Sequence, residues 1–216
     1  MHNILTIAIQ LLVILFALSV HESAHAWMAE RFGDPTGRLQ GRISLNPIAH
    51  IDPVGTVIFP ILLALIGAPV FGWAKPVQVN SFNLRNPRKD GIYIAAAGPV
   101  SNIIMAVSAI IIFLLLKQTG IIGTQYVVSR SAEAITMLLL NLILINIFLA
   151  IFNLLPVPPL DGSRILEGIL EGEALNIYKK IEPYGFIILL AVIYLGIFDI
   201  IARPVVNFIM RILFYG

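Results

Sequence analysis

The residues best suited to chemistry in this sequence are two histidines and a glutamate, spaced His-Glu-Ser-Ala-His at residues 21–25. On a helix, His21 and His25 lie one turn apart on the same face, so both imidazoles can bind one metal ion. Glu22 lies on their flank, where a carboxylate can take a proton from an attacking water. The spacing therefore predicts a zinc site that activates water.

The setting of this motif is a membrane helix. Residues 4–20, directly before it, form an almost unbroken apolar run of about five helical turns, long enough to enter a bilayer. No basic region precedes the run and no small-residue cleavage site follows it, which argues against a signal peptide.

Composition extends this interpretation to the whole chain. It has 216 residues, of which 58% are hydrophobic and 12% charged, and its mean hydropathy is +0.92. A soluble domain carries about twice that charge. We expect one membrane-embedded domain over residues 1–216, with a core at 1–162 and C-terminal helices at 163–216. The lipid bilayer is its expected surrounding.

Two further limits come from the same counts. There is no cysteine, so a metal must be held by His, Asp, Glu or Asn. The net charge of +2 gives no indication of a nucleic-acid partner.

The hydropathy pattern predicts an all-α polytopic fold with about five to six apolar helices. A helix from about Asn3 to Arg31 ends at Gly33-Asp34-Pro35, and the block at 54–66 contains Pro60 and is expected to be re-entrant. Two pieces, 38–45 and 72–79, alternate loosely and are expected to be short strands. The remaining segments are spanning helices at 92–116 and 134–155, an amphipathic stretch at 163–182, an apolar helix at 184–198, and a short block at 204–215 that either lies in the interface or spans the membrane.

A third metal ligand is expected, because a catalytic zinc usually has three protein ligands. Asp161 is the candidate, since it follows the 134–155 helix closely within a proline-rich segment, and acids near the membrane are costly without a function. Asp161 can reach the histidines only if 54–66 dips into the membrane and returns. The motif end of the first helix and the Asp161 end of the 134–155 helix then lie on the same side of the membrane.

The distribution of Lys and Arg residues supports the re-entrant path, because ten of them then lie on the same side of the membrane as the metal site. The positive-inside rule makes this side cytoplasmic, and we expect a cell-membrane protein with its site near the cytoplasmic face. The ten are Arg31, Arg38, Arg42, Lys75, Arg85, Arg88, Lys89, Arg164, Lys179 and Lys180, whereas Lys117, Arg130 and Arg203 lie on the other side.

Three motifs in order resemble the site-2 protease family of intramembrane zinc metalloproteases. They are His-Glu-Ser-Ala-His at 21–25, Gly-Pro-Val-Ser-Asn at 98–102, and Asn-Leu-Leu-Pro-Val-Pro-Pro-Leu-Asp-Gly at 153–162. Together they span most of the chain. Many relatives have a second glycine where this chain has Ser163. The chain resembles a minimal member, because 119–133 is too short for a PDZ domain and no CBS domains are seen.

The resemblance implies roles for individual residues. His21, His25 and Asp161 would hold one Zn²⁺ per chain, and Glu22 would be the general base. Asn153 would help to bind or polarise the substrate carbonyl, and Gly98 would allow close helix packing.

Other polar residues have two readings each. Asn102 either contacts the site or bridges helices, as Asn141 and Asn146 are expected to do. His50 either shapes the active site or supports its loop.

The function implied is hydrolysis of peptide bonds within or near transmembrane segments of membrane proteins, so the expected partner is a transmembrane substrate. The alternative is a non-proteolytic zinc-binding membrane protein, either a transporter or a pseudoprotease partner. Many transporters are built from internal repeats, and this chain shows none. It also retains Glu22, which a pseudoprotease would lack. Sequence gives no prediction of the oligomeric state.

Overall fold

The computed structural model describes residues 4–65, 74–122 and 130–215, and it is built from helices. The predicted helix at 3–31 is α1, Ile4–Arg31, and the predicted spans at 92–116 and 134–155 are α4, Pro87–Gln118, and α5, Arg130–Asn153. The other helices are α2 (Thr36–Leu39), η1 (Pro47–His50), η2 (Pro53–Ile58), α3 (Phe59–Leu65), η3 (Ser81–Asn83), α6 (Asp161–Ile169), α7 (Gly172–Ile181), η4 (Glu182–Tyr184), α8 (Gly185–Tyr194) and α9 (Ile197–Tyr215).

By length and composition, three of the described helices can cross a membrane, or four if the bent pair at the C-terminal end is one span. The three are Thr6–Arg31, Pro87–Gln118 and Ser131–Asn153, and the bent pair is Gly172–Tyr194 with Ile197–Tyr215, which meet at 58°. Many large apolar side chains on these helices are exposed, including Leu12, Ile104 and Ile111, as lipid-facing residues would be. The chain is thus a multi-pass membrane protein, and within the described residues the predicted count of five to six apolar helices is not confirmed.

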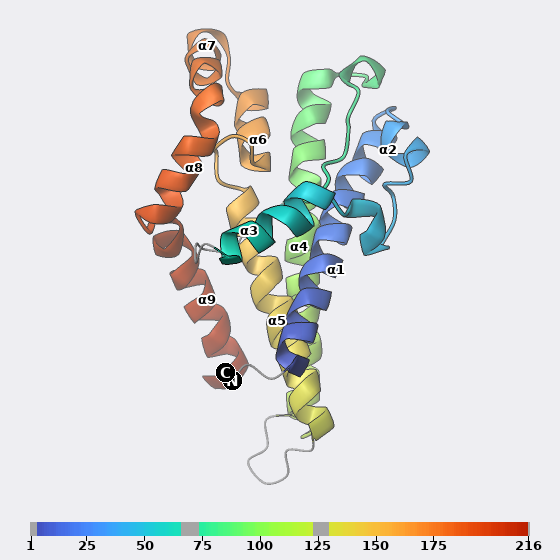
Figure 1. Ribbon diagram of the computed structural model, residues 1–216, viewed down its shortest axis with the longest axis vertical. Helices are drawn as coiled ribbons and strands as arrows, with labels where there is room; N and C mark the ends of the chain where they lie inside the picture. Colours follow the sequence, from blue (N-terminus) through green and yellow to red (C-terminus); the bar gives the residue numbers. More distant parts are fainter. Residues whose placement is uncertain (1–3, 66–73, 123–129, 216) are drawn as a thin grey trace.

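The long helices α1, α4 and α5 stand side by side, with α4 running opposite to the other two (Figure 1). Alanines on α4 let α5 and α9 approach closely, and Phe113, Ile143 and Leu213 fill the space between them. Lys117, at the end of α4, donates to the carbonyl of Leu213 over 2.8 Å and so fixes the end of α9.

The chain between α1 and α4 leaves and re-enters the bundle at the same end (Figure 1). It therefore makes no net crossing, as the predicted path requires. Here η2 and α3 run obliquely across the long helices, and their 13 residues span about 20 Å, too short to cross a membrane. Whether the 54–66 block is re-entrant stays a prediction, since residues 66–73 lie outside the described part.

The two predicted strands are wrong within the described residues, where no strand occurs. Residues 36–39 instead form α2, and Gly41, with φ +69°, turns the chain after it. Residues 74–80 are extended but single, and their N–H groups bond to α1 and to the loop after α2 rather than to a second strand. The alternating pattern therefore reflects half-buried Val77 and Val79 beside exposed Gln78 and Asn80, without a strand partner in the described structure. Residues 72 and 73 lie outside the described part.

Buried Asp34 ties the end of α1 to the chain before α4. Its carboxylate accepts hydrogen bonds from the backbone of Thr36 (3.1 Å), the backbone of Asn80 (2.7 Å) and the side chain of Asn83 (2.8 Å). Burial alone would raise the pKa of Asp34, but these hydrogen bonds outweigh it and lower the pKa below its ordinary value. The turn predicted at Gly33-Asp34-Pro35 is therefore an anchor for the segment at 80–83.

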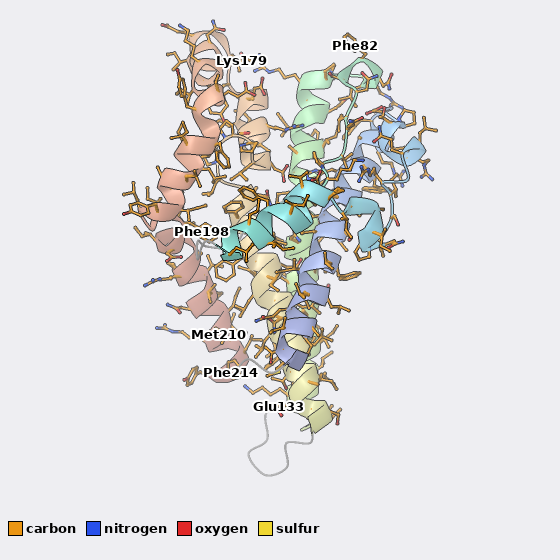
Figure 2. All side chains as sticks on the ribbon, viewed as in Figure 1. Phe82, Glu133, Lys179, Phe198, Met210 and Phe214 are labelled. Carbon is orange, nitrogen blue, oxygen red and sulfur yellow. The ribbon has the colours of Figure 1, made fainter. Side chains whose placement is uncertain are left out.

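The C-terminal part differs from the predicted boundaries. The apolar helix expected at 184–198 breaks at Gly196, which has φ +71°, a conformation that favours glycine. The helix expected at 204–215 begins already at Ile197, and its Ile209 and Leu213 pack against α4 and α5. Figure 2 shows Lys179 at the end of the molecule where Phe82 lies, and Phe214 at the opposite end beside Glu133.

Candidate metal centre

His21 and His25 face α4, and each is held by a hydrogen bond from its Nδ1 atom. His21 Nδ1 lies 2.6 Å from Asn102 Oδ1, and His25 Nδ1 lies 2.7 Å from the carbonyl oxygen of Ile94. Ile94 and Asn102 are eight residues apart on α4, so they lie on one face two turns apart. One stripe of α4 thus orients both imidazoles and turns their Nε2 atoms toward each other, 3.1 Å apart.

Asp161 is brought to the same point by the helix that it begins, α6. The other end of α6 is fixed to α4, where the guanidinium of Arg88 donates to the carbonyls of Gly168 (2.9 Å) and Leu170 (2.8 Å). Gly168 lies so close to Ile92 that a side chain there would collide with it. As a result α4 positions all three candidate ligands, although they come from α1 and α6.

The three groups form a cluster that could hold a cation. Asp161 Oδ2 lies 3.1 Å from His21 Nε2 and 3.4 Å from His25 Nε2, and it is a buried atom without a hydrogen-bond partner in the described structure. Because both imidazoles donate through Nδ1, their Nε2 atoms present lone pairs. With both imidazoles neutral, three electron-rich atoms face one another, and a positive ion between them would relieve their repulsion. One ligand atom from each residue lies within 4.8 Å of the others, so the group could hold one metal ion.

Gly98 leaves the space for that ion. A Cβ atom at this position would lie only 2.6 Å from His21 Nε2 and closer still to His25 Nε2. Gly98 lies on the same stripe of α4, midway between Ile94 and Asn102. The glycine expected to allow helix packing therefore also keeps the site between the ligand atoms open. Two imidazoles and one carboxylate are a usual donor set for catalytic zinc, and thiolates are absent from the sequence.

Glu22 is held in place by the extended segment beside α1. Its Oε2 accepts a hydrogen bond from the backbone N–H of Val77 over 3.1 Å. The neighbouring residue Ser23 donates to the carbonyl of Ser44 (2.6 Å) and accepts from the N–H of Ser44 (2.9 Å). Two of the three inner residues of the motif, Glu22 and Ser23, thus anchor separate loops on the same end of α1.

The remaining candidates lie at different distances from the cluster. Asn102 does both things considered for it, since it contacts His21 and bridges to Asn146 of α5 over 2.7 Å. The amide of Asn153 donates to the carbonyl of Leu149 on its own helix, and within the described structure it makes no hydrogen bond to the three ligand residues.

His50 is buried in the loop, where its Nε2 donates to the carbonyl of Ser44 over 2.8 Å. Its Nδ1 has no partner among the described atoms, and the ring borders a small cavity with Ser19. The contacts therefore place His50 in the loop that Ser23 anchors, outside the metal cluster.

Sequence reasoning missed the use of Arg88, the Ile94 carbonyl and Val77. The last two contribute backbone atoms, which leave no trace in residue type. Asn146 was expected to bridge helices and does so, whereas Asn141 bonds to the carbonyl of Met137 on its own helix.

A candidate metal centre of this donor set, with a carboxylate next to it on a membrane helix, is typical of a membrane metalloprotease. The chain belongs to peptidase family M50, whose model matches residues 9–125 and 117–195. This is the site-2 protease family that the three motifs indicated.

Named relatives agree with this class. The chain is 35% identical to a Bacillus subtilis (strain 168) protein named "Putative zinc metalloprotease YwhC", over 91% of this chain and 84% of that one. It is 29% identical to "Putative zinc metalloprotease Rip2" of Mycolicibacterium smegmatis, over 83% of this chain and 64% of that one. No solved structure matches the chain. The chain is thus a metalloprotease, and zinc is the metal that fits its ligands and its relatives' names.

Proposed function

We propose that this chain is an intramembrane protease, which hydrolyses peptide bonds within or near transmembrane segments of membrane proteins. His21, His25 and Asp161 hold its zinc, and residues 1–216 act as one membrane-embedded unit. The observation that carries the proposal is the convergence of three lone-pair atoms on one buried point at the end of a membrane helix.

The chemistry divides between the cofactor and the side chains. Zinc, when bound, acidifies water and polarises a carbonyl. Glu22 accepts the proton of the attacking water and then returns it to the leaving amine. The hydrogen bond from Val77 supports this role, because it fixes one carboxylate oxygen and leaves the other for the proton. Asn153, one helical turn beyond Leu149, is the candidate to contact the substrate carbonyl. Asn102 supports the ligand His21, and His50 supports the loop at Ser44.

A membrane-spanning substrate must unwind before it can be cut, because its backbone carbonyls are bonded within its own helix. The extended segment 74–80 is the candidate to hold the unwound chain by pairing with its backbone. The N–H groups of Lys75 and Val77 bond inward, to His50 and Glu22. The N–H of Asn80 also bonds inward, to Asp34. The N–H of Gln78, between Val77 and Asn80, is unpaired within the described residues and is the candidate to face the substrate.

This pairing is tested by comparing Gln78→Pro with Gln78→Ala in a cleavage assay. Proline removes the outward N–H and leaves the inward bonds of Lys75 and Val77 untouched. We expect Gln78→Pro to lower the cleavage rate at least tenfold and Gln78→Ala to leave it nearly unchanged. Equal rates for the two variants would contradict pairing at this edge.

The site lies near one membrane face, which we propose is the cytoplasmic face of the cell membrane. About 9 Å of helix separates His25 from Arg31, where α1 ends. Lys179 lies at one end of the molecule (Figure 2), and Arg88, which binds α6, belongs with it to the ten basic residues expected on the side of the metal site. The positive-inside rule supports a cytoplasmic position for this end.

The protease function is tested with Glu22→Gln in proteoliposomes that contain a single-span model substrate. The amide keeps an oxygen that can accept from Val77 but cannot take up a proton. We expect cleavage to fall by at least a thousandfold while one zinc per chain is retained. Cleavage that survives this change would exclude Glu22 as the base.

A further inference from the structure

A chain of hydrogen bonds leads away from the metal centre through three helices. His21 Nδ1 on α1 lies 2.6 Å from Asn102 Oδ1 on α4, and Asn102 Nδ2 donates to Asn146 Oδ1 on α5 over 2.7 Å. Asn146 Nδ2 donates in turn to the carbonyl of Leu142, one turn earlier on α5, over 2.8 Å. Both asparagines are fully buried, so no water competes for these bonds.

The last acceptor in this series of hydrogen bonds, the carbonyl of Leu142, determines which group donates in each of the others. A backbone carbonyl can only accept, so Asn146 must turn its NH₂ group toward Leu142 and its oxygen toward Asn102. Asn102 must then offer its NH₂ group to Asn146 and its oxygen to His21. Against that oxygen His21 Nδ1 must carry the proton, which leaves the lone pair on Nε2, where the metal binds.

The second histidine shows why a relay is needed. His25 Nδ1 faces the carbonyl of Ile94 directly, and a carbonyl alone fixes its tautomer. An asparagine amide, by contrast, offers a donor or an acceptor depending on which way it is turned. Asn102 therefore cannot define the tautomer of His21 until Asn146 has fixed its orientation.

We propose that Asn146 is a positioning residue of the metal centre, although it contacts neither metal nor substrate. Through Asn102 it holds His21 in the tautomer with Nδ1 protonated and Nε2 free, before the metal arrives. This rests on the proposed function in so far as His21 is a zinc ligand. Groups behind a ligating histidine typically change metal affinity 10- to 100-fold when removed, and we expect an effect in this range.

The test compares Asn146→Leu with Asn141→Leu in detergent-purified protein. Asn141 is a matched control, because it lies on the same helix and makes the same bond to the carbonyl four residues earlier, that of Met137, over 2.8 Å. Nitrogen-15 NMR of the metal-free protein reports the tautomer of His21, and competition with a chelator reports zinc affinity. Thermal unfolding of each variant records the loss of stability separately.

We expect His21 in wild type and Asn141→Leu to be protonated at Nδ1, and in Asn146→Leu to show both tautomers. Zinc affinity should fall about tenfold or more in Asn146→Leu and stay within about twofold of wild type in Asn141→Leu. Adding Asn146→Leu to Asn102→Leu should cause no further loss of affinity, because the two act in series. If Asn146→Leu does not fold, Asn146→Ser, which is too short to reach Asn102, gives the same comparison.

A wild-type tautomer and unchanged zinc affinity in the Asn146 variant would overturn the proposal. So would an equal loss of affinity in the Asn141 variant, which would indicate a general effect of polar residues on α5. Failure of the proposed function is distinguishable, because it would appear as absent cleavage or absent zinc in wild type. The tautomer of His21 is read without zinc or substrate.

Discussion

Replacing Gly98 with alanine tests whether the space between the ligand atoms is required. The added Cβ would lie 2.6 Å from His21 Nε2, and closer to His25 Nε2, whereas ordinary contact begins at 3.4 Å. At least 0.8 Å of movement is therefore needed. The imidazoles cannot easily turn away, because Asn102 and Ile94 hold their Nδ1 atoms from the same helix as Gly98. Either α4 shifts or the ligands separate, at a cost of about 1–3 kcal/mol in the free energy of unfolding.

We expect Gly98→Ala to lower zinc affinity at least a hundredfold, as judged by chelator competition and by zinc content per chain. Gly91→Ala is the matched control on α4, since a Cβ there meets no atom within 4 Å. Alanine favours a helix over glycine by about 1 kcal/mol, so the control should be as stable as wild type or more so. Helicity measured by circular dichroism shows that each variant is folded. Equal zinc affinities for the two variants would refute the inferred geometry of the site.

Further predictions concern the surroundings of the site. Asp34→Asn should lower the free energy of unfolding by about 1–3 kcal/mol at pH 7, because the amide cannot accept all the hydrogen bonds of the carboxylate. Since the pKa of Asp34 is lowered in the folded protein, its contribution is full above the ordinary carboxyl pKa of about 4 and is lost as the pH falls through the folded-state value. Thermal unfolding at pH 7 and pH 2 should show the difference from wild type shrinking in acid, and a constant difference would contradict this. Gly168→Ala should displace Ile92 and loosen the contact between α6 and α4. We expect zinc affinity to fall about tenfold, a smaller loss than for Gly98→Ala. Unchanged affinity would show that the α6 contact does not position Asp161.

The sequence predicted the long helices and the identity of the clustered side chains, because both depend on local patterns. Apolar runs marked α1, α4 and α5, and the spacing of His21 and His25 follows from helical geometry. The convergence of Asp161 on these histidines followed from a topological argument about the segment between α1 and α4.

Other features depend on contacts that no local pattern encodes. The segment at 72–79 resembled a strand, but Val77 bonds to a carboxylate of α1 instead of a neighbouring strand. The break at Gly196 needed the backbone conformation, since glycine within an apolar helix is also tolerated. The orientation of Asn102 depends on Asn146, 44 residues away, and only the fold brings them together.

The most direct test of the account is the zinc content of the detergent-purified chain, wild type beside Asp161→Ala. Asp199→Ala is the control, because this acid is exposed on α9 and pairs only loosely with Arg203 at 3.5 Å. We predict one zinc per chain in wild type and in the control, and its loss or marked weakening in Asp161→Ala. A folded wild type without zinc, or full zinc binding by Asp161→Ala, would contradict the assignment of His21, His25 and Asp161 as one metal centre.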